Sequence, residues 1–308
     1  MAKRKRRKSK SGNSRTLLLL GCFALIAFGI ILMMRQSPES TANIPGITAN
    51  TPVEEYKSAA NNGTPGSSKG HTKGSKHYPG LEYVELPEKL TSQIKEYAGF
   101  TISFNKDNRT PNYVAWELLD EETNGEKGRS NNFWSDPDIE GCPTTADYTR
   151  SGYDRGHMCP SGEQKWSHEA MNDCFVMANM CPQVHELNNG AWKTLESKER
   201  QWAARDSALM IVAGPIYEKT DKERIGKAGV RVPSAFFKVL LAPYVDEPRG
   251  IAFVYPNMKA PGNMNEYAMS IDQLEKILGY DFFPALPDEI ENKVESSYSF
   301  KEWNSSKK

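Results

Sequence analysis

One histidine in this sequence has neighbours that suit phosphate chemistry. It closes the segment Asp154-Arg155-Gly156-His157. Histidine is the usual general base near neutral pH, because its neutral imidazole can accept a proton there. Arg155 offers a planar, permanently charged guanidinium to a phosphate, and Gly156 lets the backbone approach a ligand closely. The four residues suit an active site, although a structural or surface histidine fits the same segment.

Two polar stretches downstream could complete such a site. Residues 179–183 read Asn-Met-Cys-Pro-Gln, and residues 187–192 read Leu-Asn-Asn-Gly-Ala-Trp. Amides beside apolar residues also occur where a loop enters a helix, and Asn188 is a suitable N-cap. Either interpretation places Asn188 at the start of a helix, where its carbonyl oxygen caps the helix or binds a metal ion.

The helix predicted over 188–203 carries a glutamate on the same broad face as Asn188. At ~100° per residue, Asn188 and Glu196 lie ~80° apart in projection and about 12 Å apart along the axis. Both can therefore hardly bind one metal ion directly. The spacing predicts that Asn188 binds directly and that Glu196 acts through a metal-bound water. The alternative is a surface ion pair between Glu196 and Arg200, four residues on.

Together these elements resemble the DNA/RNA non-specific endonucleases, a family within the ββα-metal superfamily. The resemblance rests first on Asp154-Arg155-Gly156-His157, Asn179-x-x-Pro182-Gln183 and Leu187-Asn188-x-Gly190-x-Trp192-x-x-Leu195-Glu196. Further matches are Asn112-Tyr113-Val114-Ala115-Trp116, Arg129 ahead of Asp136-Pro137, Val212-Ala213-Gly214-Pro215, Val232-Pro233, Phe237-Lys238 and Phe282-Phe283-Pro284. These motifs follow one another in order, so the resemblance covers nearly all of the chain beyond its N-terminal third.

The resemblance implies a Mg²⁺-dependent endonuclease that cuts DNA and RNA with little sequence preference, since contacts to the phosphate backbone carry no base information. His157 would be the general base. Asn188 would be the single direct protein ligand of Mg²⁺, with Mn²⁺ as a substitute, and Glu196 would hydrogen-bond the metal's waters. Asn179 would help to shape the site. Three arginines would contact phosphate or the developing charge, namely Arg129, Arg155 and Arg200.

The pattern of apolar residues favours an α+β fold with a mainly antiparallel central sheet and flanking helices, and the resemblance implies the ββα-metal nuclease fold. Strand-like stretches dominate, and helices intervene without regular βαβ alternation. Predicted strands cover 101–104, 113–119, 208–213, 235–241 and 251–255, and predicted helices cover 167–173, 188–203 and 271–278. Residues 105–112 and 120–150 are predicted to be turns and loops.

The N-terminus carries a topological signal. Residues 1–35 hold nine Lys and Arg and no Asp or Glu, and the uncharged run 16–34 would be about 28 Å long as a helix. These features predict a basic cytoplasmic tail (1–15), a transmembrane anchor (16–34) and a flexible linker (35–80) before the endonuclease domain (81–308). The domain is then expected to be periplasmic or extracellular, with secretion after signal cleavage as the alternative.

Charge is distributed unevenly along the chain. The whole sequence is neutral, but residues 86–308 hold 26 Lys and Arg against 34 Asp and Glu, a net charge of −8. An acidic domain has no global field that attracts nucleic acid. Phosphate binding must therefore depend on a local cluster of arginines, lysines or metal.

Cysteines and histidines leave two alternatives open. Cys142, Cys159, Cys174 and Cys181 could form two disulfides, with Cys159–Cys181 as one pair, or remain small buried thiols. A zinc-stabilised nucleic-acid-binding module is another alternative, with zinc held by His157, Cys159, Cys174, Cys181 and His185, although the spacings fit no C-x₂-C pattern. A catalytically inactive relative that only binds nucleic acid is the other alternative.

Overall fold

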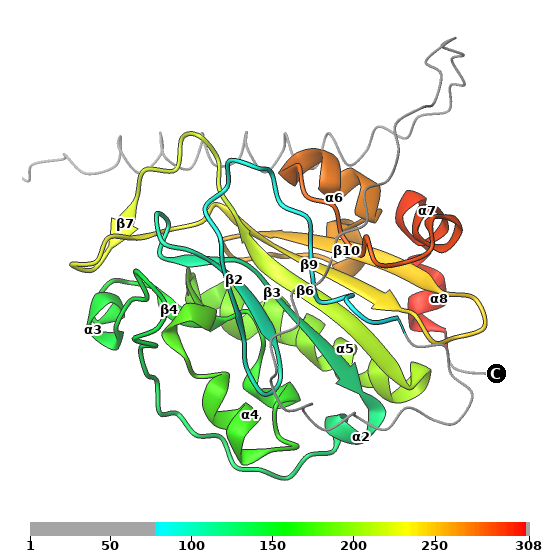
Figure 1. Ribbon diagram of the computed structural model, residues 1–308, viewed down its shortest axis with the longest axis horizontal. Helices are drawn as coiled ribbons and strands as arrows, with labels where there is room; N and C mark the ends of the chain where they lie inside the picture. The colour runs from blue at the N-terminus through cyan, green and yellow to red at the C-terminus, as the bar shows by residue number, and fades with distance from the viewer. Residues whose placement is uncertain (1–77, 306–308) are drawn as a thin grey trace, which may run out of the picture. The chain divides into compact units, whose positions relative to one another are not determined.

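The computed structural model describes residues 78–305, which are built on a seven-stranded sheet (Figure 1). The strands lie in the order β1-β2-β3-β6-β9-β10-β11, and all neighbouring pairs are antiparallel. Their bounds are β1 Gln93–Glu96, β2 Thr101–Asn105, β3 Thr110–Leu119, β6 Ala208–Ile216, β9 Ala235–Ala242, β10 Arg249–Pro256 and β11 Ala268–Met269. The predicted α+β class with a mainly antiparallel sheet is confirmed.

The predicted strands all occur, and the differences lie at their ends. β3 begins at Thr110, inside the predicted turn, because Thr110 pairs with Asn105 at the end of β2. The stretch 120–150 is not entirely loop, since it contains α2 (Asp120–Thr123) and α3 (Thr145–Tyr148). Each of these helices has only four residues, which is too short to show a helical period in the sequence.

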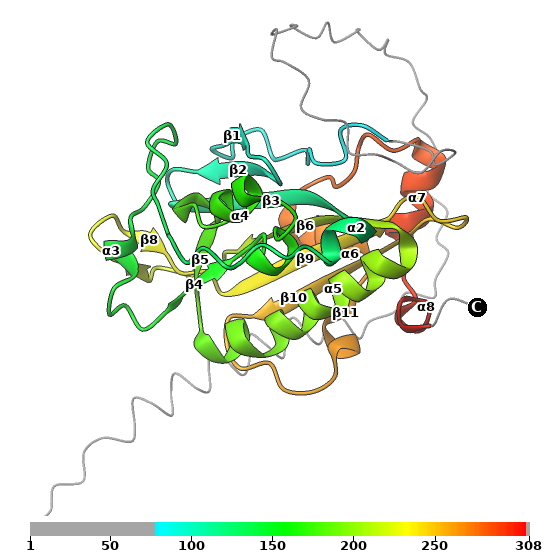
Figure 2. The ribbon, with the colours of Figure 1, turned by 90° about the horizontal axis from the view of Figure 1, so that it is seen from below.

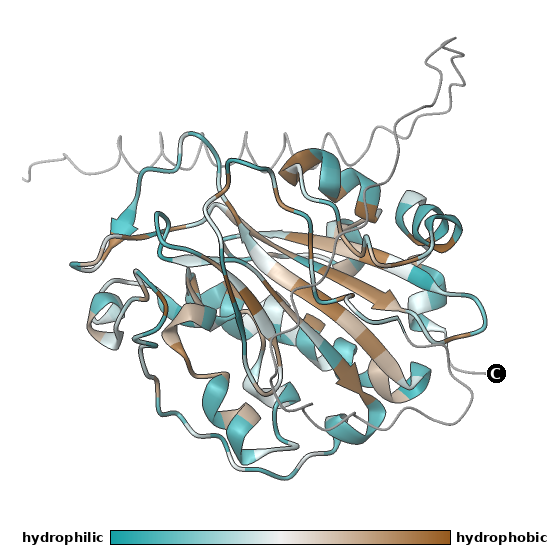
Figure 3. Cartoon of the chain, in the orientation of Figure 1, coloured by the Kyte–Doolittle hydropathy of each residue, from teal (hydrophilic) through white to brown (hydrophobic). Residues whose placement is uncertain are grey.

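The central strands are covered on both faces, as the side view shows (Figure 2). Lys238 of β9 points to α5 (Lys193–Asp206), whereas its neighbour Phe237 packs against Phe282 on the opposite face. On that second face α6 (Ile271–Leu278) and α7 (Asp288–Ser296) pack against β10. Successive side chains of a strand point to opposite faces, so strands buried on both sides are largely apolar along their whole length. Figure 3 shows this hydrophobic concentration along the central strands.

A smaller two-stranded sheet lies beside the main one and leads into α5. β4 (Asp154–His157) pairs antiparallel with β5 (Met180–Gln183). Between them lies α4 (His168–Asp173), which Ser167 caps by accepting hydrogen bonds from two backbone N–H groups. The remaining elements are the hairpin of β7 (Arg224–Ile225) and β8 (Val230–Arg231) and the 3₁₀ turns Ser161–Glu163, Met177–Asn179 and Met264–Tyr267.

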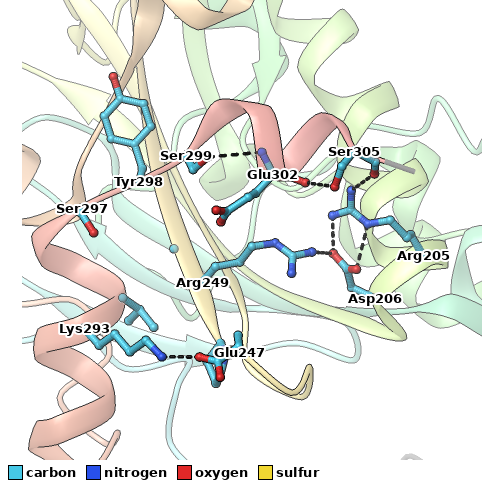
Figure 4. A pocket seen from close by; sticks show the side chains of 13 residues that line it. Arg205, Asp206, Glu247, Arg249, Lys293, Ser297, Tyr298, Ser299, Glu302 and Ser305 are labelled. Carbon is cyan, nitrogen blue, oxygen red and sulfur yellow. Dashed lines mark hydrogen bonds and ion pairs between the residues drawn. The ribbon is translucent and has the colours of Figure 1, made fainter. Parts of the chain in front are cut away.

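Paired charges attach the last helix, α8 (Phe300–Asn304), to the end of α5 (Figure 4). Asp206 is almost fully buried and accepts from both Arg205 and Arg249. Arg205 also donates to the backbone oxygens of Trp303 at 2.6 Å and Ser305 at 3.0 Å. These guanidinium groups line a cavity of about 740 Å³, and both pair with Asp206.

The predicted membrane segment cannot be placed in this fold. Within residues 78–305, no helix combines the length and apolar character that crossing a bilayer requires. The predicted tail (1–15), the anchor (16–34) and most of the linker (35–80) lie outside the described residues. These three segments stay predictions from the sequence.

Gly250 of β10 is the point at which α6 and α7 both approach the sheet. A Cβ atom there would lie 2.6 Å from Ile271 of α6 and 2.6 Å from the Val294 backbone of α7. We expect Gly250→Ala to lower the free energy of unfolding by about 2 kcal/mol, because a rigid strand and two helices must move apart. Chemical denaturation measures this change. Gly128→Ala, at a position with no atom within 4 Å of the added Cβ, is the control and should be near neutral. Equal stability of the two variants would contradict the packing argument.

Candidate active site

A cavity of about 560 Å³ opens where β4 meets the start of α5. Six of the residues that the sequence predicts for the site line it, namely Arg129, Arg155, His157, Asn188, Glu196 and Arg200. Lys165, Lys193 and His185 lie on the same wall. Five permanently cationic side chains thus face one carboxylate, so this cavity is basic although the domain as a whole is acidic.

His157 ends β4 and is held among aromatic rings. Its side chain is 8% exposed, with ring centroids 5.0 Å from Phe175 and 5.7 Å from Phe133. Trp192 donates from its indole Nε1 to the His157 backbone oxygen, over 3.3 Å. Nε2 of His157 is buried and has no hydrogen-bond partner among the described residues. A buried polar atom without a partner is costly, so its place beside a cavity indicates a ligand or water as its partner.

The surroundings of His157 keep its imidazole neutral. The pKa of His157 is lowered to about 3, mainly by burial and also by the positive charges of Arg129 and Arg155, against a hydrogen bond to the Arg155 backbone that raises it. Because Nε2 has no partner, that hydrogen bond fits donation from Nδ1 to the Arg155 carbonyl. The neutral tautomer with its proton on Nδ1 leaves the Nε2 lone pair free to accept a proton.

Aromatic rings and hydroxyl groups orient the arginines. The guanidinium carbon of Arg155 lies 4.4 Å from the Phe133 ring centroid, and that of Arg129 lies 4.9 Å from the Phe175 ring. Arg129 also donates to Ser161 and, over 2.7 Å, to Asn131. Stacked guanidinium groups keep their donor edges available for a phosphate. Phe133, Phe175 and Ser161 were not predicted, because contacts across the fold leave no local signal in the sequence.

Arg200 pairs with a glutamate that sequence reasoning also missed. Its Nη1 lies 3.6 Å from Oε1 of Glu163, and it donates to Ser197 from Nη2 over 3.1 Å. Arg200 is therefore oriented by Glu163 from the 3₁₀ turn Ser161–Glu163, in place of the surface pair with Glu196 that the helical spacing left open.

Asp154 holds the amide of Asn188. Nδ2 of Asn188 donates to Oδ2 of Asp154 over 2.8 Å, and Nδ1 of His185 lies 2.8 Å from the same oxygen. Since the amide nitrogen is taken by Asp154, the carbonyl oxygen of Asn188 is left for the cavity. The sequence placed Asp154 in the motif without a role. The pairing of Asp154 with Gln183 across β4 and β5, just ahead of Asn188, is what brings it here.

The helix start differs from the straight helix predicted over 188–203. Residues Leu187–Trp192 form a π-helical turn, in which Gly190 departs from helical angles with φ −111° and ψ −112°. Asn188 therefore lies inside this turn and is not an N-cap. The axial separation of Asn188 and Glu196 that a straight helix predicts does not apply, although both side chains line the same cavity. A π-helical turn of this kind is frequent at functional sites.

Glu196 is half-buried and carries the cavity's carboxylate. Burial raises the pKa of Glu196 to about 7; Lys238, Arg200 and Arg129 lower it, and Glu199 raises it. A neutral amide oxygen and one carboxylate form a sparse set of oxygen ligands. Such a set fits Mg²⁺, which keeps most of its waters and binds few protein groups directly. The donor set therefore fits the metal that the sequence predicts.

Asn179 does not line the cavity. It is fully buried in the turn before β5, where Oδ1 accepts from the Cys159 N–H over 2.9 Å. Its Nδ2 donates to the backbone oxygens of Cys159 at 2.9 Å and Cys174 at 2.8 Å. The amide thus braces the chain just beyond His157 and acts on the site only through the backbone.

Gly156 is required for a reason other than ligand approach. A Cβ atom at Gly156 would lie 2.4 Å from Oε1 and 2.6 Å from Cβ of Gln183, across the β4–β5 pair. Gln183 is fully buried. Gly156 therefore lets the two strands close over Gln183.

Of the two alternatives left open for the cysteines, the structure has thiols and not disulfides. Cys142, Cys159, Cys174 and Cys181 are all free thiols, and the last three are buried. Cys159 accepts a hydrogen bond from Gln164, and Cys174 donates one to the Met171 backbone. Nor do the proposed zinc ligands converge, since among the described residues the only group of three clustered metal-ligand types is acidic and lies elsewhere. Zinc therefore has no support in this fold.

Beneath the cavity lies an ion pair with no access to solvent. Nζ of Lys238 in β9 lies 2.7 Å from Oε2 of Glu199 in α5, and both side chains are 0% exposed. The ammonium group also lies over the rings of Trp192 and Trp116. Burial alone lowers the pKa of Lys238, but Glu199, Glu196 and Glu163 raise it above its usual range, so this lysine stays charged.

Comparison with known proteins identifies the family of this chain. The sequence model of the DNA/RNA non-specific endonucleases matches residues 77–289. The chain belongs to the DNA/RNA non-specific endonuclease family. It is 36% identical over 220 residues to the mitochondrial nuclease EXOG of Danio rerio, covering 65% of this chain and 63% of that protein. The mitochondrial endonuclease G of Bos taurus is 30% identical over 268 residues, or 81% of this chain and 86% of the relative.

A solved structure supports the same assignment. An endonuclease G in complex with its inhibitor matches with a TM-score of 0.59 and 27% identity, over 64% of this chain and 87% of that chain. The family to which this chain belongs consists of enzymes that hydrolyse phosphodiester bonds. The match spans about three fifths of the first curated relatives.

The names of these endonuclease relatives contradict the predicted location. Both curated proteins are called mitochondrial, which points away from a periplasmic or extracellular domain. That prediction, in its anchored and its secreted form, is therefore wrong. It rested on the uncharged run 16–34 and on the basic, acid-free residues around it, and an N-terminus rich in basic residues is a feature that exported and mitochondrially targeted chains share.

The Lys238–Glu199 pair gives a direct test of the buried network. We expect Lys238→Met to lower the free energy of unfolding by about 3–5 kcal/mol, because Glu199 is left buried without its counter-charge. The double variant Lys238→Met/Glu199→Gln should recover part of that loss, as no unpaired charge remains. Urea denaturation of both variants measures the difference. A loss below about 1 kcal/mol in Lys238→Met would show that the pair does not hold α5 to the sheet.

The low pKa of His157 predicts a pH dependence of stability. In the unfolded chain this histidine binds a proton near pH 6.5, whereas in the folded chain it does so only near pH 3. Its contribution to the free energy of unfolding is therefore complete above pH 6.5 and is lost as the pH falls. Relative to His157→Gln, the free energy of unfolding of the wild-type chain should fall by about 1.4 kcal/mol for each pH unit as the pH is lowered from 6.5 to 4. Taking the difference removes the opposite slope of Glu196, whose raised pKa destabilises the fold as the pH rises. Parallel profiles of the two proteins would refute the buried, neutral histidine.

Proposed function

We propose that this chain is a Mg²⁺-dependent endonuclease with the ββα-metal nuclease fold, which hydrolyses phosphodiester bonds of DNA and RNA with little sequence preference. One observation carries the proposal: a neutral, buried His157 with a free Nε2 stands at the wall of a cavity lined by five cationic side chains. Family membership supports the reaction class. The β4–β5 pair followed by α5 supplies the two strands and the helix of that fold.

His157 is the general base of the proposed reaction. Its Nε2 accepts a proton from water, and the water oxygen attacks the phosphorus atom as the bond to the leaving oxygen breaks. The hydrogen bond at Nδ1 and the flanking Phe133 and Phe175 rings hold the imidazole in one orientation. The tautomer is therefore fixed before substrate binds, which is the condition for efficient proton transfer.

Asn188 and Glu196 are the groups that would hold Mg²⁺, Asn188 directly and Glu196 through a water molecule; Mn²⁺ is expected to substitute. The bound ion supplies charge neutralisation at the phosphate and at the leaving oxygen. Asp154 keeps the Asn188 amide turned so that its oxygen, and not its nitrogen, faces the cavity. Such supporting hydrogen bonds set the affinity of a metal site as strongly as its direct ligands.

The arginines bind the phosphate in this proposal. Arg129, Arg155 and Arg200 line the cavity and donate charge-assisted hydrogen bonds to phosphate oxygens. Their planes are set by Phe175, Phe133 and Glu163. Such contacts read the backbone and not the bases, which accounts for action on both DNA and RNA.

A cleavage assay with single- and double-stranded DNA and RNA tests this function. We expect His157→Ala to reduce cleavage roughly 10²–10⁴-fold with the fold intact, because the proton acceptor is lost. His168→Ala, an exposed histidine on α4, is the matched control and should keep full activity. EDTA should stop the wild-type reaction and Mg²⁺ should restore it.

Two results would overturn the proposal. Wild-type rates in His157→Ala would remove its role as the base. Nucleic-acid binding without any cleavage by the wild-type chain in Mg²⁺ would instead identify an inactive binding module.

A further inference from the structure

A group of carboxylates lies on the face of the sheet opposite the candidate active site. It belongs to α6 and α7, which lie next to each other along one edge of the molecule in Figure 1. Both helices pack on β10 at Gly250, whose missing side chain permits the close approach. The active-site helix α5 packs on the other face, against Lys238. The two regions are thus separated by the thickness of the sheet.

Three of these carboxylates converge on one point. Asp272 and Glu275 are one helical turn apart on α6, and Glu295 comes from the last turn of α7. One carboxylate oxygen from each residue lies within 4.8 Å of the other two. Oxygens bound to one Ca²⁺ at about 2.4 Å are at most about 4.8 Å apart, so the three atoms fit a single coordination sphere.

Glu295 provides a second, independent observation, because one of its carboxylate oxygens has no partner in the described part of the chain. Its side chain is 6% exposed, and its Oε1 is buried with no hydrogen-bond partner among residues 78–305. Glu275, in contrast, accepts a hydrogen bond from the Phe282 N–H over 2.8 Å. Burial of a carboxylate without a donor or a counter-charge is costly. The orphaned oxygen lies at the point where a cation would satisfy it.

Carboxylates dominate the electrostatic surroundings of Glu295. Burial raises the pKa of Glu295 to about 9, and each charged neighbour that contributes, Glu275, Glu291, Asp281 and Asp272, raises it as well. Lys293, two residues before Glu295 on α7, is turned away and pairs with Glu247. The charges that act most strongly on Glu295 are therefore negative, and their field attracts a cation into the cluster.

We propose that Asp272, Glu275 and Glu295 form a Ca²⁺-binding site that joins α6 to α7. Asp272 and Glu275 are half-exposed, so an ion can enter from solvent, while Glu295 closes the inner side. Three side-chain oxygens with water completing the shell suit Ca²⁺, which accepts irregular sets of six to eight oxygens. Mg²⁺ demands an octahedron with shorter bonds and binds such a set less well. The ion's role is structural, and it is independent of the proposed nuclease chemistry.

Thermal unfolding of the full chain with added CaCl₂ tests the site. Asn188→Ala is used as the parent, so that binding at the proposed active-site metal position does not contribute. We expect saturating Ca²⁺ to raise the melting temperature of this parent by roughly 5 °C, because the ion binds only the folded state. Equal concentrations of Mg²⁺ should give a smaller rise. Calorimetric titration should show one Ca²⁺ per chain.

Isosteric substitutions locate the binding. Adding Glu295→Gln to the parent should abolish both the rise and the calorimetric signal, and the metal-free protein should be at least as stable, since a buried acid is replaced by a neutral amide of the same size. Glu289→Gln, an exposed position on α7 outside the cluster, is the matched control and should keep the full rise. Asp272→Asn, at a half-exposed ligand, should weaken Ca²⁺ binding at least tenfold and gives a second measure if the buried substitution impairs folding.

Two outcomes would contradict the proposed Ca²⁺ site. A parent whose melting temperature does not respond to Ca²⁺ would show that Glu295 is simply protonated. A rise that survives Glu295→Gln and Asp272→Asn would place the bound ion elsewhere. Neither outcome depends on whether the cavity beside α5 cleaves nucleic acid.

Discussion

The buried pair of Lys238 and Glu199 is the interaction on which the active-site side of this protein depends. It joins the central strand β9 to α5 with no access to water on either side. α5 carries Glu196 and Arg200, and the π-helical turn before it carries Asn188. A buried charge pair tolerates little displacement, because any separation leaves an unpaired charge in a medium of low dielectric constant. The pair thereby fixes the position of three predicted site residues at once.

The local arrangement of charged side chains explains how an acidic domain can present a basic cavity. The net charge of a domain acts over long distances, at which salt screens electrostatic interactions. A bound phosphate instead interacts with side chains that lie only a few ångströms away. Arg129 and Arg155 are stacked on aromatic rings that also enclose His157. Those two arginines and burial keep His157 neutral, and neutrality is what a proton acceptor requires. In the proposed function, one arrangement of side chains thus serves both phosphate binding and base catalysis.

Buried carboxylates have different charged neighbours on the two faces of the sheet. On the α5 face, Glu199 and Glu163 have Lys238 and Arg200 within reach. On the α6–α7 face, the charges that act most strongly on Glu295 are carboxylates, and its Oε1 has no partner among the described residues. A carboxylate of the first kind stabilises the position of a neighbouring element. One of the second kind requires a proton or a cation, which is why we place a Ca²⁺ site there.

The sequence by itself determined the family, the α+β class and the central strands. It also predicted seven residues at the site, and six of them line the cavity. These follow from motif order and from apolar patterns, which are local properties of the chain. Tertiary structure alone decided the rest. Asn179 proved to brace the backbone outside the cavity, and Asn188 lies in a π-helical turn and not at a helix cap. Phe133, Asp154 and Glu163 gained their roles, and Cys159 and Cys181 remained thiols, through contacts between segments distant in sequence, whose geometry no local spacing encodes.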